Sequence, residues 1–151
     1  MCLKNAGRWI PALLFIKMNI TLEQAQTALT AAIAKATDMK VKMNIAVVDA
    51  GANLTAFARQ DGAWLGSIDI AIKKARTARF FDMPSSAIGK LSQPGEPLYG
   101  IEGTNDGLVS FGGGFPITDA AGVVIGAIGV SGGSVKEDEK VAEAGIDALK
   151  K

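Results

Sequence analysis

The sequence contains no histidine and only one cysteine, Cys2, among its 151 residues. Imidazole is the commonest metal ligand and the side chain whose unperturbed pKa lies nearest neutrality. Its absence excludes Ser-His-Asp catalysis, Cys-His catalysis and histidine-ligated metal sites. A single cysteine excludes a disulfide framework and a thiolate cluster for zinc or iron–sulfur, and it is compatible with a reducing compartment.

The chain also has little net charge and few aromatic residues. Sixteen lysines and arginines against fifteen aspartates and glutamates give a formal charge of +1, and aromatic residues make up 6% of the composition. Because binding to a phosphate backbone needs a surplus of positive charge, nucleic acid is not an expected partner. The 48% hydrophobic fraction is mainly Ala, Val, Ile and Leu, and 18 glycines allow close packing of layers.

No apolar run approaches the roughly 20 residues that a membrane-spanning helix needs. The N-terminal segment superficially resembles a secretion signal, with basic residues ahead of the apolar run 10–16, but Pro11 interrupts that run and no small residues follow as a cleavage site. We therefore expect 1–17 to be an extension outside the core, with translation starting naturally at Met18, and 18–151 to form one domain. A cytoplasmic protein with no membrane attachment is expected.

Three segments have the spacing of amphipathic helices. Thr21 and Gln24 form a capping-box pattern ahead of small apolar residues at three- and four-residue spacing, and Ser134 and Glu137 repeat that pattern near the C-terminus. Flanking prolines leave room for only a short helical turn after Pro84. The expected helices are 22–37, 65–81 and one from 134 to about 149, with the short turn at 85–91.

Short β-branched and apolar runs separated by Gly, Asn and Asp turns predict strands. Links of hairpin length pair these strands antiparallel, since parallel pairing needs crossovers of about a dozen residues or more. The last run is apolar on both faces, which places it centrally in a sheet covered on both sides. The sequence thus predicts an α+β fold with a five-stranded antiparallel sheet between helices. The predicted strands are 43–49, 53–59, 106–111, 115–118 and 123–130.

Several segments, in their order and spacing, resemble the GlcG/HbpS family over about residues 18–149. They are Ala46–Gly51, Asp61–Ala63, Ser67–Ala78, Pro97–Ile101, Phe111–Ile117 and Gly126–Gly133. This family includes haem-binding and haem-degrading proteins and the C-terminal domain of the cobalamin-associated protein PduO. The resemblance implies a profilin-like α/β/α sandwich of three layers, a sheet order of 2-1-5-4-3, and assembly into homo-oligomers, dimers or larger.

The resemblance also makes haem a candidate cofactor, although no histidine is present to ligate its iron. Tyrosinate and thioether ligation of haem are known chemistry, so other side chains could approach the iron. Nothing in the sequence selects one of them. The candidates are Tyr99, Lys73, Lys74, Met43, Met83 and Thr104.

Two glycine-rich segments are the strongest candidates for a ligand site. Consecutive glycines at 112–114 let a ligand touch backbone amides, and the segment 131–134 precedes a capped helix whose N-terminal dipole favours an anion. Each segment also has a purely structural explanation. The glycines at 112–114 could form a tight strand connection with a bulge, and 131–134 could be an ordinary strand-to-helix turn. The expected ligand-binding residues are Gly112, Gly113, Gly114, Pro116, Ser131, Gly132, Gly133, Lys73, Tyr99, Thr104 and Asn105.

Few other side chains suggest chemistry. Lys73, Tyr99 and Glu102 are candidates for proton transfer, while the basic run 73–79 on the second helix is interpreted as a solvated face. Aromatic residues, among them Trp64, could line an apolar pocket or belong to the core and a subunit interface. No metal site is expected, because no calcium loop or other ligand cluster is visible.

Three functions remain open from the sequence. The first is a small-molecule-binding protein that holds an anionic metabolite, or haem or another tetrapyrrole without histidine ligation, between the two glycine segments. The second is an enzyme acting on a small carboxylate or carbonyl compound, with glycine amides stabilising negative charge. The third is a purely structural oligomeric scaffold.

Overall fold

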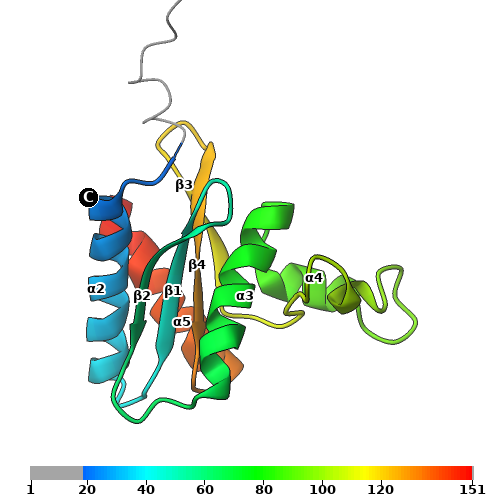
Figure 1. Ribbon diagram of the computed structural model, residues 1–151, viewed down its shortest axis with the longest axis horizontal. Helices are drawn as coiled ribbons and strands as arrows, with labels where there is room; N and C mark the ends of the chain where they lie inside the picture. Colours follow the sequence, from blue (N-terminus) through cyan, green and yellow to red (C-terminus); the bar gives the residue numbers. More distant parts are fainter. Residues whose placement is uncertain (1–18, 151) are drawn as a thin grey trace, which may run out of the picture.

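The computed structural model describes residues 19–150 and shows one antiparallel sheet with helices on both faces (Figure 1). Helices α2 and α5 cover one face of the sheet, and α3 covers the other. The strands are β1 (Asn44–Asp49), β2 (Leu54–Arg59), β3 (Gly114–Thr118) and β4 (Val124–Ser131). The helices are α2 (Leu22–Asp38), α3 (Gly66–Phe81), α4 (Ser85–Leu91) and α5 (Val135–Asp147), with short 3-10 helices η1 (Ile101–Gly103) and η2 (Ala148–Lys150).

The predicted helices are confirmed, and the two predicted capping boxes fix where α2 and α5 begin. Thr21 Oγ1 accepts a hydrogen bond from the Gln24 N–H at 3.1 Å, and the Gln24 side chain accepts one from the Thr21 N–H at 3.0 Å. Ser134 and Glu137 make the same reciprocal pair at α5. Each box satisfies backbone donors that a helix start otherwise leaves free.

The antiparallel α+β architecture is confirmed, but the five-stranded sheet and its order 2-1-5-4-3 are wrong. Within residues 19–150 the sheet has four strands in the order β2-β1-β4-β3. The segment 106–111, predicted as an edge strand, bonds elsewhere: the Val109 N–H donates to Thr77 Oγ1 of α3, and the Leu108 N–H donates to the Glu102 carbonyl. Because these donors are satisfied by a helix and a loop, the segment 106–111 does not pair with β3 as a strand.

Small residues bring the layers of the domain close together. The buried face of α2 consists of alanines, and it packs with Ile45, Val47 and Ile128 of the central strands in the main core. On the other face, Gly129 of β4 lies directly under α3, where an added Cβ would be 2.1 Å from the Ala71 carbonyl oxygen. This close approach accounts for the small aliphatic and glycine-rich composition.

The segment from α4 to η1 projects away from the sheet as a lobe (Figure 1). Turn hydrogen bonds hold it, among them Leu98 N–H to the Leu91 carbonyl at 2.9 Å. Ser85 Oγ anchors its base by donating to the Phe111 carbonyl at 2.7 Å and accepting from the Gly114 N–H at 2.9 Å. Between residues 19 and 150, no helix combines the length and apolarity needed to cross a bilayer.

Candidate functional site

The two predicted glycine segments meet at one point beside α3 and α5. The Val130 N–H donates to the Gly113 carbonyl at 2.9 Å, which joins the end of β4 to the 112–114 segment. The ammonium of Lys74, from α3, donates to the Val130 carbonyl at 2.9 Å and to Asp138 Oδ2 at 2.7 Å. Asp138 lies in the first turn of α5, and its Oδ1 accepts the Gly133 N–H at 3.0 Å. A buried ion pair therefore ties both glycine segments together.

Burial sets the electrostatics of this pair. Lys74 is 0% exposed and Asp138 is 3% exposed, and the Phe111 ring centre lies 4.9 Å from the Lys74 ammonium. Burial lowers the pKa of Lys74 against the attraction of Asp138, and burial raises the pKa of Asp138 against the attraction of Lys74. The interpretation of Lys74 as part of a solvated basic face is wrong, because its side chain points into the domain and is paired there.

The glycines at this junction are needed for close packing. Gly113 has a φ of +115°, and an added Cβ would lie 2.7 Å from the Val130 carbonyl oxygen and 2.8 Å from the Lys74 ammonium. Amides on the other segment already have protein acceptors, since Gly133 donates to Asp138 and Ser134 donates to Glu137. A ligand anion would have to compete with these carboxylates, and the role of Gly112, Gly113, Gly114, Ser131, Gly132 and Gly133 in ligand binding stays a prediction.

The other predicted site residues lie on α3, on the lobe and in the turn after η1, where the Lys73 ammonium is beside Gly107. Lys73 forms a salt bridge with Asp69 at 2.9 Å on α3, and Tyr99 is 70% exposed on the lobe. Thr104 donates to the Ile101 carbonyl at 2.8 Å, and the Asn105 side chain donates to Thr104 Oγ1 at 3.0 Å, so both serve the turn after η1.

The surroundings of two further predicted residues, Glu102 and Pro116, are also defined. A hydrogen bond from the Ser110 hydroxyl, with a smaller contribution from a backbone bond, lowers the pKa of Glu102. Pro116 is half-buried in β3 opposite Ala127 of β4. The proposed roles of Lys73, Tyr99, Glu102, Thr104, Asn105 and Pro116 are not tested by these positions.

The candidate iron ligands differ in how accessible they are. Lys74 and Met43 are 0% exposed, and Lys74 already has its partners. Met83 is half-buried after α3, and Tyr99 is exposed. Across residues 19–150, no group of three or more Cys, Asp and Glu side chains is arranged to hold a metal ion. A ligand could reach the remaining candidates, which are Tyr99, Met83, Lys73 and Thr104, without disrupting the core.

A groove next to Gly132 was missed by the sequence reasoning. It has a volume of about 260 Å³, and its lining includes Lys40, Lys42, Gly62, Trp64 and Gly132. Gly132 is one of the predicted binding residues, while the two lysines come from the link between α2 and β1. The sequence signal for this groove was the alternation of Lys40 and Lys42 ahead of a strand, together with a tryptophan after a glycine turn.

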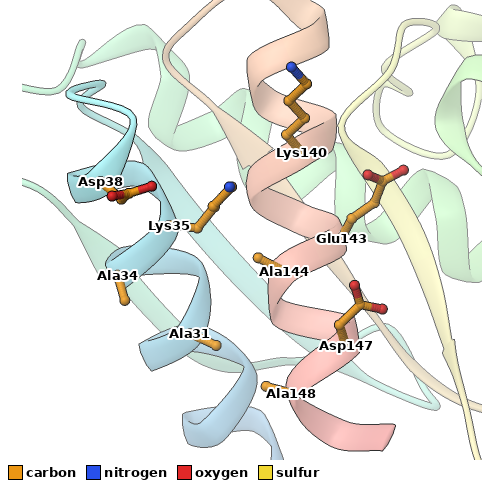
Figure 2. A pocket seen from close by; sticks show the side chains of 9 residues that line it. All are labelled: Ala31, Ala34, Lys35, Asp38, Lys140, Glu143, Ala144, Asp147 and Ala148. Atoms are coloured by element: carbon orange, nitrogen blue, oxygen red, sulfur yellow. The ribbon is translucent and has the colours of Figure 1, made fainter.

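A larger groove, of about 770 Å³, lies between α2 and α5 on the other face of the sheet (Figure 2). Both helices contribute lysines and acids to its walls, and Lys35 extends from α2 toward α5. Two lysines against three carboxylates leave no surplus positive charge for an anion. Its lining consists of Ala31, Ala34, Lys35, Asp38, Lys140, Glu143, Ala144, Asp147 and Ala148.

Comparisons with known proteins identify relatives across almost the whole domain. An uncharacterised 15.0 kDa protein from the dhaT-dhaS intergenic region of Citrobacter freundii is 41% identical over 131 residues, covering 86% of this chain and 92% of that protein. The corrinoid adenosyltransferase PduO of Citrobacter freundii is 35% identical over 133 residues, which are 87% of this chain but only 39% of PduO. The chain therefore spans well under half of PduO.

A solved structure and a family model agree with these relatives. The crystal structure of the PduOC–haem complex superposes with a TM-score of 0.82 at 34% identity, covering 86% of this chain and 94% of that one. The model of the family described as haem degrading protein HbpS-like matches residues 20–147. The chain belongs to the HbpS-like family.

Proposed function

We propose that this protein binds a small anionic ligand, with haem or another tetrapyrrole as the leading class, and that it holds this ligand without histidine. The observation that carries the proposal is the similarity to PduOC, which was crystallised with haem and shares the fold over 86% of this chain. The complete absence of histidine gives the proposal its particular form. Recognition then depends on contacts to the ring and to acidic substituents.

The donor set of the chain fits a tetrapyrrole held by its ring and carboxylates, and it does not fit a histidine-ligated haem. Lys74 and Met43 are enclosed, so an iron ligand from this chain would have to be an accessible side chain such as Tyr99 or Met83. The propionates of a haem are anionic, and lysine ammonium groups or free backbone amides are the groups that bind carboxylates. Haem would supply redox chemistry when bound, and the chain's own residues would orient its edge.

The proposed ligand region is the groove beside Gly132. Gly132, one of the predicted binding residues, lines this groove, and the groove has no acidic lining residue, which favours this place for an anionic ligand over the mixed-charge groove between α2 and α5. The amides of Gly133 and Ser134 are occupied by carboxylates. We infer that a ligand enters the groove that Gly132 lines and does not displace these carboxylates.

Two equilibrium titrations test the proposed function. Haemin is followed by its Soret band and iron-free protoporphyrin IX by its fluorescence. If the protein holds the ligand by its ring and carboxylates, both compounds bind at micromolar protein with similar affinity, whereas much tighter binding of haemin would indicate that a side chain such as Tyr99 or Met83 ligates the iron. Absence of any spectral change with either compound would exclude a tetrapyrrole ligand.

We also propose that the protein is a homo-oligomer, as the family resemblance implies. Large apolar side chains that remain exposed on the single chain support this, and among them are Leu22 at 57%, Leu54 at 47% and Tyr99 at 70%. Exposed apolar side chains of this size can be covered by a neighbouring subunit. Sedimentation-equilibrium centrifugation of the full chain tests the assembly, and a monomer at all concentrations would contradict it.

A further inference from the structure

The groove beside Gly132 has walls that are held by partly buried hydrogen bonds. The Asn44 side chain, which is 0% exposed, donates to the Trp64 carbonyl at 3.0 Å. The Arg59 guanidinium donates twice to the Ala63 carbonyl, at 3.1 and 3.0 Å. Gln60 accepts the Met43 N–H at 2.8 Å and so ties the 60–64 turn to the start of β1. The backbone of this turn is therefore held in place before any ligand arrives.

Glycines bring the three walls of the groove together. Gly62 has a φ of +80°, and an added Cβ would lie 2.9 Å from the Lys42 ammonium. Gly132 has a φ of +148°, and an added Cβ would lie 2.3 Å from the Lys42 carbonyl oxygen. Side chains at these positions would push the walls apart. The close approach leaves the Lys42 ammonium beside bare backbone.

The charge of the groove is positive and unbalanced. Lys40 and Lys42 are exposed, and within residues 19–150 neither forms a salt bridge. No acidic side chain lines the groove. Both lysines line this one groove, so a single ligand can reach their two ammonium groups. They can bind one carboxylate together or two neighbouring carboxylates.

Lys40 occupies a backbone position that suits glycine better. It follows the C-terminus of α2 with a φ of +58°, and the Val41 N–H donates to the Ala36 carbonyl at 3.0 Å while the Lys40 N–H donates to the Thr37 carbonyl at 3.0 Å. This is the bonding pattern of a helix end that glycine usually completes. A lysine here costs stability compared with glycine, so a functional reason for its ammonium group is expected.

Trp64 supplies a flat apolar surface at the mouth of the groove. Its side chain is 68% exposed although its carbonyl is held by a buried asparagine. An indole beside ammonium groups matches a ligand that has both a conjugated ring and a carboxylate, since the ring stacks on the indole and the carboxylate pairs with the lysines. The groove volume of about 260 Å³ accommodates the edge of such a ligand.

We propose that Lys40, Lys42, Trp64 and Gly132 form the recognition site for the carboxylate edge of a flat conjugated ring. This inference rests on the proposed function and assigns residues to it. A tetrapyrrole propionate and a smaller aromatic carboxylate share this chemistry. Protoporphyrin IX and 2-naphthoate therefore serve as the two probes, and protoporphyrin IX dimethyl ester, whose carboxylates are masked, serves as the control ligand.

Matched variants separate the site from general effects of charge and exposure. Lys40→Gln with Lys42→Gln is compared with Lys35→Gln plus Lys140→Gln, which removes two charges from the α2–α5 groove (Figure 2). Trp64→Ala is compared with Leu65→Ala at the adjacent exposed position. Lys40→Gly keeps the favoured backbone and should raise the melting temperature by roughly 2–4 °C. Weaker binding by this variant is then not a result of unfolding.

The expected results are specific for each arm. The double lysine variant should bind protoporphyrin IX about threefold to tenfold more weakly, as two exposed ion pairs are lost, and Trp64→Ala should bind about threefold to tenfold more weakly. Both control variants should stay within twofold of the natural protein, and the dimethyl ester should show no lysine dependence. Binding of 2-naphthoate with the same dependence extends the site to small acids, whereas binding of protoporphyrin IX alone restricts it to the macrocycle.

Two outcomes overturn the inference and are distinguishable. If the natural protein binds protoporphyrin IX and all groove variants keep its affinity within twofold, the ligand lies elsewhere and the proposed function survives without this site. If the natural protein binds neither probe, the proposed function fails together with the site. A change in oligomeric state in Trp64→Ala with unchanged affinity would assign the indole to a subunit interface instead.

Discussion

Replacing Lys74 by methionine is expected to destabilise the protein more than any other single change to the junction of the glycine segments. The substitution keeps the length of the side chain and removes its charge. The Asp138 carboxylate, 3% exposed, still accepts the Gly133 N–H but has no cation beside it, and the Val130 carbonyl loses its ammonium donor. Removing one partner of a buried ion pair costs about 3–5 kcal/mol.

Urea denaturation measures this cost. With an m-value of about 2 kcal/mol per molar urea, a loss of that size lowers the transition midpoint by roughly 1.5–2.5 M. Lys74→Met combined with Asp138→Asn removes both charges and keeps an oxygen that can accept the Gly133 N–H. Because residues in direct contact are not additive, the double variant should lose less than the sum of the single losses, by about 1–3 kcal/mol.

The cost of Lys74→Met should also depend on pH. Burial already raises the pKa of Asp138, and removing Lys74 takes away the hydrogen bond and charge that oppose this rise. A carboxyl whose folded pKa lies above its unfolded value stabilises the fold below the unfolded pKa, and that contribution is lost as the pH rises through the folded pKa. The loss in Lys74→Met should therefore be larger at pH 8 than at pH 5. A loss below about 1 kcal/mol at pH 8, or the same loss at both values, would refute the account of a buried, interdependent pair.

Other changes test the packing, a cap and an exposed hydrogen bond. Gly129→Ala places a Cβ 2.1 Å from a backbone oxygen of α3 and should lower stability by about 3 kcal/mol or more in thermal melts, while Gly66→Ala, which meets no atom within 4 Å, should not. Ser134→Ala removes the hydroxyl that accepts the Glu137 N–H in the capping box of α5. It should lower the free energy of unfolding by about 1 kcal/mol in urea denaturation. Ser110→Ala should raise the pKa of Glu102 toward its ordinary value, measured by NMR titration of the carboxyl carbon, and an unchanged pKa would contradict the assigned hydrogen bond.

Local patterns predicted most of the architecture, because the responsible contacts are close in sequence. The capping boxes at Thr21 and Ser134 span three residues each, and the observed helices begin there. The antiparallel pairing of β1 with β2 follows from the short turn that Asp49 closes by accepting the Gly51 and Asn53 N–H groups. Such features depend on neighbouring residues alone.

The errors came from contacts between distant residues. The segment 106–111 has the composition of a strand, yet Thr77 of α3 takes the Val109 N–H, and a helical threonine gives no sign of this in the sequence. Lys73 and Lys74 are adjacent and chemically identical, but one lies near the surface and the other is buried with Asp138, which is 64 residues away. A run of basic residues shows charge and does not show which member faces the core.

The most direct test of histidine-independent recognition in the groove beside Gly132 is a map of backbone amide chemical shifts during titration with protoporphyrin IX. The largest changes should fall on Lys40–Lys42, Gly62–Trp64 and Gly132, which form a single surface from three separate segments. Changes confined to the groove between α2 and α5, or no changes at saturating ligand, would contradict it.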